Sequence, residues 1–203
     1  MKDNRLKEQV MKDIREALMD KNIIADSEAH ITEDNPYNNE DLSVLFAQNF
    51  TRRGGVMYYC YNEGDIKIRI EDIQRKHGNV IIGNAAENLT GFLGHLGIDN
   101  CATCEANTRY PLGATLCETL IAEQGSILIS SNQGLGLTMP TLTDALIVLA
   151  FTSQVVANWE AATERLRNFY TEFPEQIMVT NPGSLAQRKN GFKIYLILIE
   201  DED

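Results

Sequence analysis

The sequence predicts an α/β protein: a three-layer α/β/α sandwich with a mostly parallel sheet and an antiparallel hairpin insertion. One observation is that several short segments are apolar along their whole length, as in strands buried on both faces of a parallel sheet. A second is that segments with helical spacing of apolar residues separate these strands, as in βαβ units. The chain of 203 residues has the length of one large domain, so we expect a single core.

The first 39 residues predict an amphipathic helix and a polar linker, ahead of one α/β domain over residues 40–203. Leu6, Val10 and Ile14 recur at helical spacing with charged residues between them. The stretch that follows this helix is polar and rich in Asn, which is typical of a linker. The apolar face of the helix packs either on its own domain or on a partner, which includes a second copy of the chain as a homodimer.

Helices and strands alternate along the rest of the chain. Helices are predicted where apolar residues recur at helical spacing, and strands where short apolar runs lie between turn residues. The strand over residues 126–130 follows a tight bend and predicts the antiparallel insertion. In order, the other predicted elements are helix 42–50, strand 56–61, helix 65–78, strand 79–83, helix 86–97, strand 144–150, helix 153–170, strand 175–180 and strand 192–200.

The charge of the chain limits its partners. The net charge is -11, which disfavours nucleic acid and anionic membranes, because both attract basic surfaces. No run approaches the roughly 20 apolar residues that span a bilayer, and the first twenty residues are charged throughout, so we expect a cytoplasmic protein. The four cysteines are then expected to be reduced thiols.

Two polar loops are the predicted ligand-binding segments. Ser130–Gly134 and Asn181–Ser184 each follow an apolar strand, where open α/β sheets bind ligands. Glycine permits close approach of the backbone, and short hydroxyl and amide side chains orient a polar group, so we expect a small anionic metabolite. The same composition also makes ordinary turns. The predicted ligand-binding residues are Gly125, Ser126, Ser130, Ser131, Asn132, Gln133, Gly134, Asn181, Gly183 and Ser184.

Glu123 is the predicted catalytic residue. It lies beside Gly125 at the expected hairpin bend, where its carboxylate would act as a base or accept a hydrogen bond from substrate. A solvated turn residue is the alternative interpretation. Glu118 lies five residues earlier, and in an extended segment an odd separation places two side chains on opposite faces, so the two are not expected to form a catalytic pair.

No metal site and no cofactor are predicted. Cys101 and Cys104 have Cys-x-x-Cys spacing, but zinc and iron-sulfur sites usually need four ligands, and Cys60 and Cys117 are isolated. Structural thiols, a redox pair and a metal shared with a partner are the three interpretations of this pair. The sequence contains no P-loop and no Gly-x-Gly-x-x-Gly after a strand.

The C-terminal half resembles a known family. The runs "LIAEQGSILISSNQG", "LTDALIVLAFTSQVV", "IMVTNPGS" and "IYLILIEDED" are together similar to the LUD domain of the lactate-utilisation protein C family. The resemblance implies a fold similar to the ribose-5-phosphate isomerase and CoA-transferase type. It also implies work beside iron-sulfur subunits that oxidise lactate to pyruvate.

The resemblance places Ala122, Glu123, Gly125 and Ser126 at the family's Ala-Glu-Thr-Gly-Thr element, with Gln124 in place of Thr. The segment after Asn181 matches Gly-Pro-Ser only loosely and lacks the Thr-Ala-Asp that follows it in the family, as well as a later Gly-Val-His-Gly-Pro. We therefore expect a LUD-type protein of organic-acid utilisation that binds a small anionic ligand or serves as a non-redox subunit of lactate oxidation. The alternative is a non-catalytic assembly or regulatory subunit that binds iron-sulfur proteins, so enzymatic activity stays open.

Overall fold

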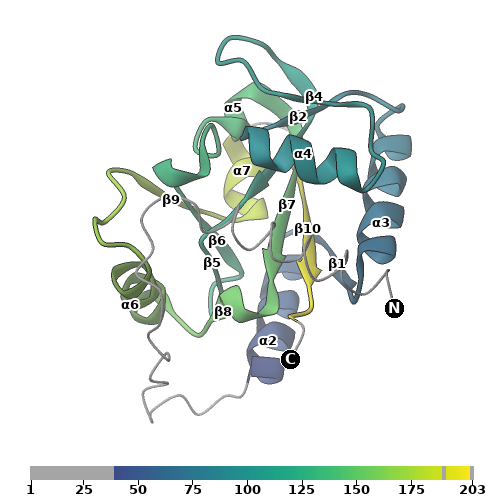
Figure 1. The fold of residues 1–203 in the computed structure, drawn as a ribbon. Helices are drawn as coiled ribbons and strands as arrows, with labels where there is room; N and C mark the ends of the chain where they lie inside the picture. Colours follow the sequence, from purple (N-terminus) through teal and green to yellow (C-terminus); the bar gives the residue numbers. More distant parts are fainter. Residues whose placement is uncertain (1–38, 189–190, 202–203) are drawn as a thin grey trace, which may run out of the picture.

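A six-stranded sheet forms the centre of the protein (Figure 1). The computed structural model describes residues 39–188 and 191–201. The order of the strands is β1-β10-β7-β4-β2-β3, and every pairing between them is parallel. The last of these strands in the sequence, β10, thus lies between β1 and β7. The strands are β1 (Val56–Cys60), β2 (Ile82–Asn84), β3 (Cys101–Thr103), β4 (Tyr110–Leu116), β7 (Thr143–Phe151) and β10 (Lys193–Ile199).

Two helices, α3 (Glu63–Lys76) and α4 (Glu87–His95), cover one face of this sheet. Their buried leucines and isoleucines pack on the alternate side chains of the strands that point to that face. The side chain of Asn62 caps α3, because its Oδ1 accepts a hydrogen bond from the Asp65 N–H at 3.0 Å. Gly78, at φ +83, follows the end of this helix in the left-handed conformation that glycine favours.

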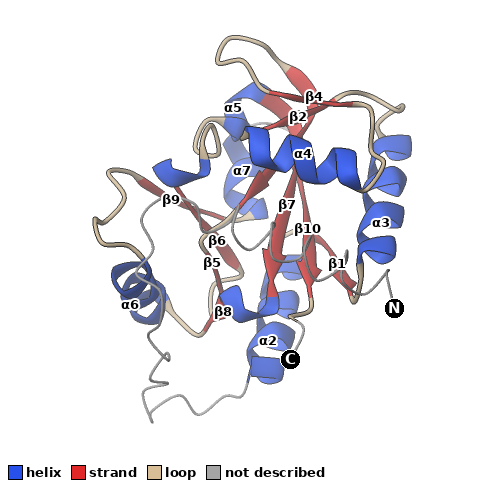
Figure 2. Ribbon diagram, viewed as in Figure 1, coloured by secondary structure: helices blue, strands red, loops and turns tan. Residues whose placement is uncertain are grey.

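A second sheet and three helices cover the other face (Figure 2). The second sheet has the order β8-β5-β6-β9, in which β5 pairs antiparallel with β6, β6 antiparallel with β9, and β5 parallel with β8. On its far side α6 packs through buried residues that include Ala162 and Leu166. These elements are α2 (Asn39–Arg52), β5 (Thr119–Ile121), β6 (Ser126–Ser130), α5 (Met139–Leu142), β8 (Val155–Val156), α6 (Trp159–Phe169), β9 (Ile177–Thr180) and α7 (Pro182–Arg188), with 3-10 turns η1 (Ser131–Gln133) and η2 (Thr152–Gln154).

The predicted α/β/α fold with an antiparallel insertion is confirmed, and the structure corrects three of its details. The strand predicted at 175–180 joins the second sheet as β9. The helix predicted over 153–170 begins at Trp159, because Asn158 caps it and the preceding residues form η2 and β8. Strands β3, β4 and β5 are additional to the predicted strands. The predicted helix in the first 39 residues lies outside the described residues, and the domain boundary near residue 40 stays a prediction.

His77, at the end of α3, gives the fold a pH-dependent contact. Its Nε2 lies 3.1 Å from the Tyr195 Oη, and burial, together with the charge of Lys193, lowers the pKa of the imidazole. In the unfolded chain the His77 imidazole has its ordinary pKa of about 6.5, and in the folded chain its pKa is lower. The contribution of His77 to stability is therefore fully present above pH 6.5 and is lost as the pH falls through the folded pKa. We expect wild type to lose more stability than His77→Gln in urea unfolding between pH 7.5 and pH 5.0. The difference in lost stability between the two proteins should be small, because the His77 ring is only half-buried. Equal losses in wild type and His77→Gln would contradict the prediction.

Candidate ligand-binding cleft

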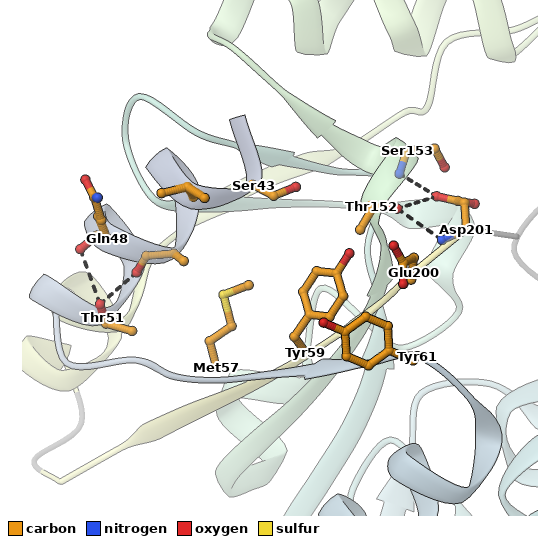
Figure 3. A pocket seen from close by; sticks show the side chains of 12 residues that line it. Ser43, Gln48, Thr51, Met57, Tyr59, Tyr61, Thr152, Ser153, Glu200 and Asp201 are labelled. Atoms are coloured by element: carbon orange, nitrogen blue, oxygen red, sulfur yellow. Dashed lines mark hydrogen bonds between the residues drawn. The ribbon is translucent and has the colours of Figure 1, made fainter. Parts of the chain in front are cut away.

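An open cleft of about 960 Å³ lies between α2 and the carboxyl ends of three neighbouring strands (Figure 3). Tyr61 directly follows β1, Glu200 follows β10, and Thr152 follows β7. Because these strands are adjacent and parallel, their ends meet at one edge, which is the edge where open α/β sheets bind ligands. The lining residues are Ser43, Val44, Ala47, Gln48, Thr51, Met57, Tyr59, Tyr61, Thr152, Ser153, Glu200 and Asp201.

Asp201 links the segments that follow β10 and β7 at the cleft. Its Oδ2 accepts hydrogen bonds from the Thr152 hydroxyl at 2.9 Å and from the Ser153 N–H at 2.6 Å, and its own N–H donates to the Thr152 hydroxyl at 3.1 Å. The N–H of Glu200 donates to the carbonyl of Cys60, which ties the end of β10 to β1. The backbone of Glu200 is therefore fixed at the end of β10, which lies between β1 and β7, and its side chain is exposed.

Two tyrosines give the cleft an aromatic wall. Tyr59 and Tyr61 are two residues apart at the end of β1, so their side chains point to the same side, with Met57 before them. Their ring centroids are 5.1 Å apart at an interplanar angle of 57°. Tyr59 is 39% exposed and Tyr61 is 65% exposed, so the ring of Tyr61 offers the larger aromatic surface to a ligand.

The structure places Glu123 at the turn between β5 and β6, with its side chain exposed. Asn49 of α2 holds this turn, since its Nδ2 donates to the backbone oxygens of Ala122 at 2.9 Å and Glu123 at 3.1 Å. Gly125, at φ +56, lies directly against the backbone of α2, and Ser126 is buried in the hairpin. None of these residues lines the cleft described above, and a catalytic role of Glu123 stays a prediction.

The Ser130–Gly134 loop surrounds a buried carboxylate, that of Glu118. Its Oε1 accepts hydrogen bonds from the hydroxyl of Ser130 and from the Nε2 of Gln133, the latter at 3.0 Å. Its Oε2 accepts a hydrogen bond from the hydroxyl of Tyr170 at 2.9 Å. Burial, followed by the charge of Glu118, raises the pKa of Tyr170. The Ser130 and Gln133 side chains are therefore bound within the protein.

The remaining residues of this loop have backbone roles or face solvent. Ser131 donates its N–H to the carbonyl of Gln176 at 2.9 Å, and the N–H of Asn132 donates to the Ser130 hydroxyl at 3.0 Å. Asn132 is exposed at the surface, and its side chain also hydrogen-bonds the side chain of Tyr170. Gly134, at φ +59, lies so close to the carbonyl of Ala85 that a Cβ would be 2.6 Å from its oxygen. Of the predicted residues of this loop, Asn132 has the most accessible side chain.

The Asn181–Ser184 segment begins α7. The Asn181 Oδ1 accepts a hydrogen bond from the Ser184 N–H at 2.9 Å, while the Ser184 hydroxyl accepts one from the Asn181 N–H at 3.2 Å. This is a reciprocal helix cap. Gly183 lies near Arg53, after the end of α2.

The two predicted loops do not lie at one site. In the antiparallel pair of β6 and β9, Ser130 lies opposite Ile177 and Ile127 lies opposite Thr180. The two loops therefore leave this pair at opposite ends, roughly 10 Å apart along the strands. The expectation that both loops hold one anionic group is not supported by this register.

Sequence reasoning missed the cleft residues and Glu118. The alternation of Met57, Tyr59 and Tyr61 was a usable signal, since it places three large side chains on one side of a strand that ends in a loop. Glu118 was excluded only as a partner of Glu123. Its three hydrogen-bond donors come from different elements, so the sequence carries no local signal of the cluster.

The paired cysteines lie on opposite faces of the six-stranded sheet. Cys101 packs against the core under α3 and α4, whereas Cys104 belongs to the core under α2. Burial raises the pKa of the Cys104 thiol to about 11. A redox pair between these two thiols is therefore not supported. Within residues 39–188 and 191–201, no group of three or more His, Cys, Asp or Glu side chains is arranged to hold a metal ion.

Fold and cleft define a three-layer α/β/α protein with a ligand-sized cleft at the carboxyl edge of its parallel sheet. Residues 104–184 match the family model of the LUD domain, which confirms the LUD resemblance seen in the sequence. The narrower assignment to lactate-utilisation protein C stays a prediction. None of the curated proteins compared with this chain matches it.

A solved structure shares the fold. The crystal structure of a DUF162 family protein from Deinococcus radiodurans superposes with a TM-score of 0.61 at 14% sequence identity, covering 81% of this chain and 99% of that one. Only Thr152 and Ser153 of the cleft lie within residues 104–184. The cleft of this chain is thus built mainly by segments outside the matched region.

Proposed function

We propose that this LUD-domain protein binds a small polar metabolite in the cleft between α2 and the ends of β1, β10 and β7. The observation that carries the proposal is the meeting of three strand ends in an open cleft, with Tyr59, Tyr61 and Glu200 exposed along it. Its volume of about 960 Å³ falls within the usual range for small-molecule sites.

The association of the LUD family with lactate utilisation makes organic-acid metabolism the proposed setting. We further propose a cytoplasmic, non-redox role beside iron-sulfur subunits in the oxidation of lactate to pyruvate, which rests on the family resemblance. Among the described helices, none combines the length and hydropathy needed to cross a membrane. The alternative, a non-catalytic subunit that binds its partners through an N-terminal helix, concerns residues outside the described range.

Thermal shift with lactate, pyruvate and a wider panel of metabolites tests the proposal. A ligand at roughly ten times its Kd stabilises the native state by about 1.4 kcal/mol and raises the melting temperature. We expect Tyr61→Ala to weaken the binding of such a ligand roughly tenfold, because the exposed ring supplies contact area. Binding that survives Tyr61→Ala but is lost in Glu123→Gln would instead place the site at the turn between β5 and β6.

A further inference from the structure

We infer that the cleft selects an organic cation, with an ammonium or guanidinium group lying against the ring of Tyr61 and paired with the carboxylate of Glu200. This inference rests on the proposed function and adds the charge of the group that is recognised. It departs from the small anionic ligand expected from the sequence.

The charged side chains that line the cleft are acidic. Two carboxylates, those of Glu200 and Asp201, belong to it, whereas the described residues that line the cleft include no Lys, Arg or His. Asp201 already accepts hydrogen bonds from Thr152 and Ser153. The Glu200 carboxylate is exposed and has no hydrogen-bond or ion-pair partner among the described residues. Both charged side chains of the lining are acidic and disfavour an anion, on a chain whose net charge is -11. The guanidinium of Arg165 on α6 lies near enough to Asp201 to offset part of the charge of that carboxylate.

The aromatic wall formed by Tyr59 and Tyr61 also favours a cation. The face of a tyrosine ring attracts a cation within about 6 Å of its centroid. On the other side of β1, the ring of Tyr58 already has the guanidinium of Arg69 at 5.4 Å and the ammonium of Lys76 at 5.8 Å. Those two cations come from α3, which covers the opposite face of the sheet. In the cleft the Tyr61 ring is 65% exposed, so a cation from solution can reach it.

A carboxylate beside two tyrosine rings recognises the cationic group itself, whether it belongs to a free metabolite or to a Lys or Arg side chain of another protein. The two sources call for two probes. Agmatine carries a guanidinium and an ammonium group on a small molecule. An acetylated and amidated tripeptide with a central arginine presents the same guanidinium on a peptide.

Calorimetric titration of the full chain at low salt tests the inference. We expect agmatine or the peptide to bind, and Glu200→Gln and Tyr61→Ala each to weaken that binding roughly tenfold. Tyr61→Phe retains the ring face and should bind nearly as wild type. Glu164→Gln removes an exposed carboxylate of α6 outside the cleft and should also bind as wild type. Binding of the peptide alone would support the inference and assign the cation to a protein side chain.

Other outcomes would overturn it. If both probes bind equally well to wild type and Glu200→Gln, or fail to bind, the inference is wrong. If lactate or pyruvate then binds and Tyr61→Ala removes that binding, the proposed function stands without the inference. If no ligand of any charge has an affinity that changes in the cleft variants, the proposed function fails as well.

Discussion

Glu118→Ala is expected to lower the free energy of unfolding by roughly 3–5 kcal/mol, as for other broken buried charge networks. The Glu118 side chain is only 7% exposed and accepts hydrogen bonds from Ser130, Gln133 and Tyr170. Alanine would leave these three donors buried without their acceptor, and desolvated donors without partners are costly. Urea unfolding of wild type and variant at pH 7 measures the difference.

Glu123→Ala is the matched control for this prediction. Glu123 lies on the same hairpin, but its side chain is exposed at the turn, so its removal should change stability by no more than about 0.5 kcal/mol. Tyr170→Phe removes only one of the three donors and should fall between the two variants. Similar losses for Glu118→Ala and Glu123→Ala would show that the buried cluster does not stabilise the fold.

Gly125→Ala is expected to destabilise the protein by about 2–4 kcal/mol, because strain and overpacking act together. A Cβ at this position would lie 2.5 Å from the backbone nitrogen of Phe50 and 2.6 Å from the carbonyl carbon of Asn49. Backbone atoms of a helix cannot rotate away as a side chain can. The φ of +56 adds the strain of the left-handed region. Thermal unfolding with a matched urea titration gives the loss.

Gly78→Ala separates the backbone strain of a positive φ from the overpacking against α2. Gly78 also has a positive φ, at +83, but a Cβ there would meet no atom within 4 Å. Its substitution should therefore cost only the backbone strain, about 1–2 kcal/mol. The excess loss in Gly125→Ala measures the close approach of α2 to the hairpin, and an equal loss in both variants would argue against that contact.

The fold was predictable where strands are uniformly apolar. Strands β1, β7 and β10 are apolar along most of their length, and this pattern is sufficient to place them. Strand β4 was missed because Pro111 and Gly113 interrupt its apolar run. The start of α6 was misplaced because Val155 and Val156 continue the apolar pattern of the helix, although they pair with β5 instead.

The site was less predictable, because it depends on which strands become neighbours. Ligands of open α/β sheets bind beyond the ends of the parallel strands, but the strands before Ser130 and Asn181 form an antiparallel pair outside the main sheet. The cleft uses the ends of β1, β7 and β10, which are far apart in the sequence. Their adjacency follows from sheet order, a tertiary property that no local pattern of Tyr61, Thr152 or Glu200 encodes.

The position of β10 inside the sheet, next to the edge strand β1, has a consequence for biosynthesis. Among the described strands the first to be made, β1, is an edge strand whose neighbour in the sheet is β10, and β10 follows every other described strand in the sequence. During translation, β1 therefore leaves the ribosome long before the strand with which it pairs. Contacts between residues this distant in sequence slow folding, and apolar strands that await them are prone to aggregate. The sheet, and with it the cleft, can close only after Ile199 has been synthesised.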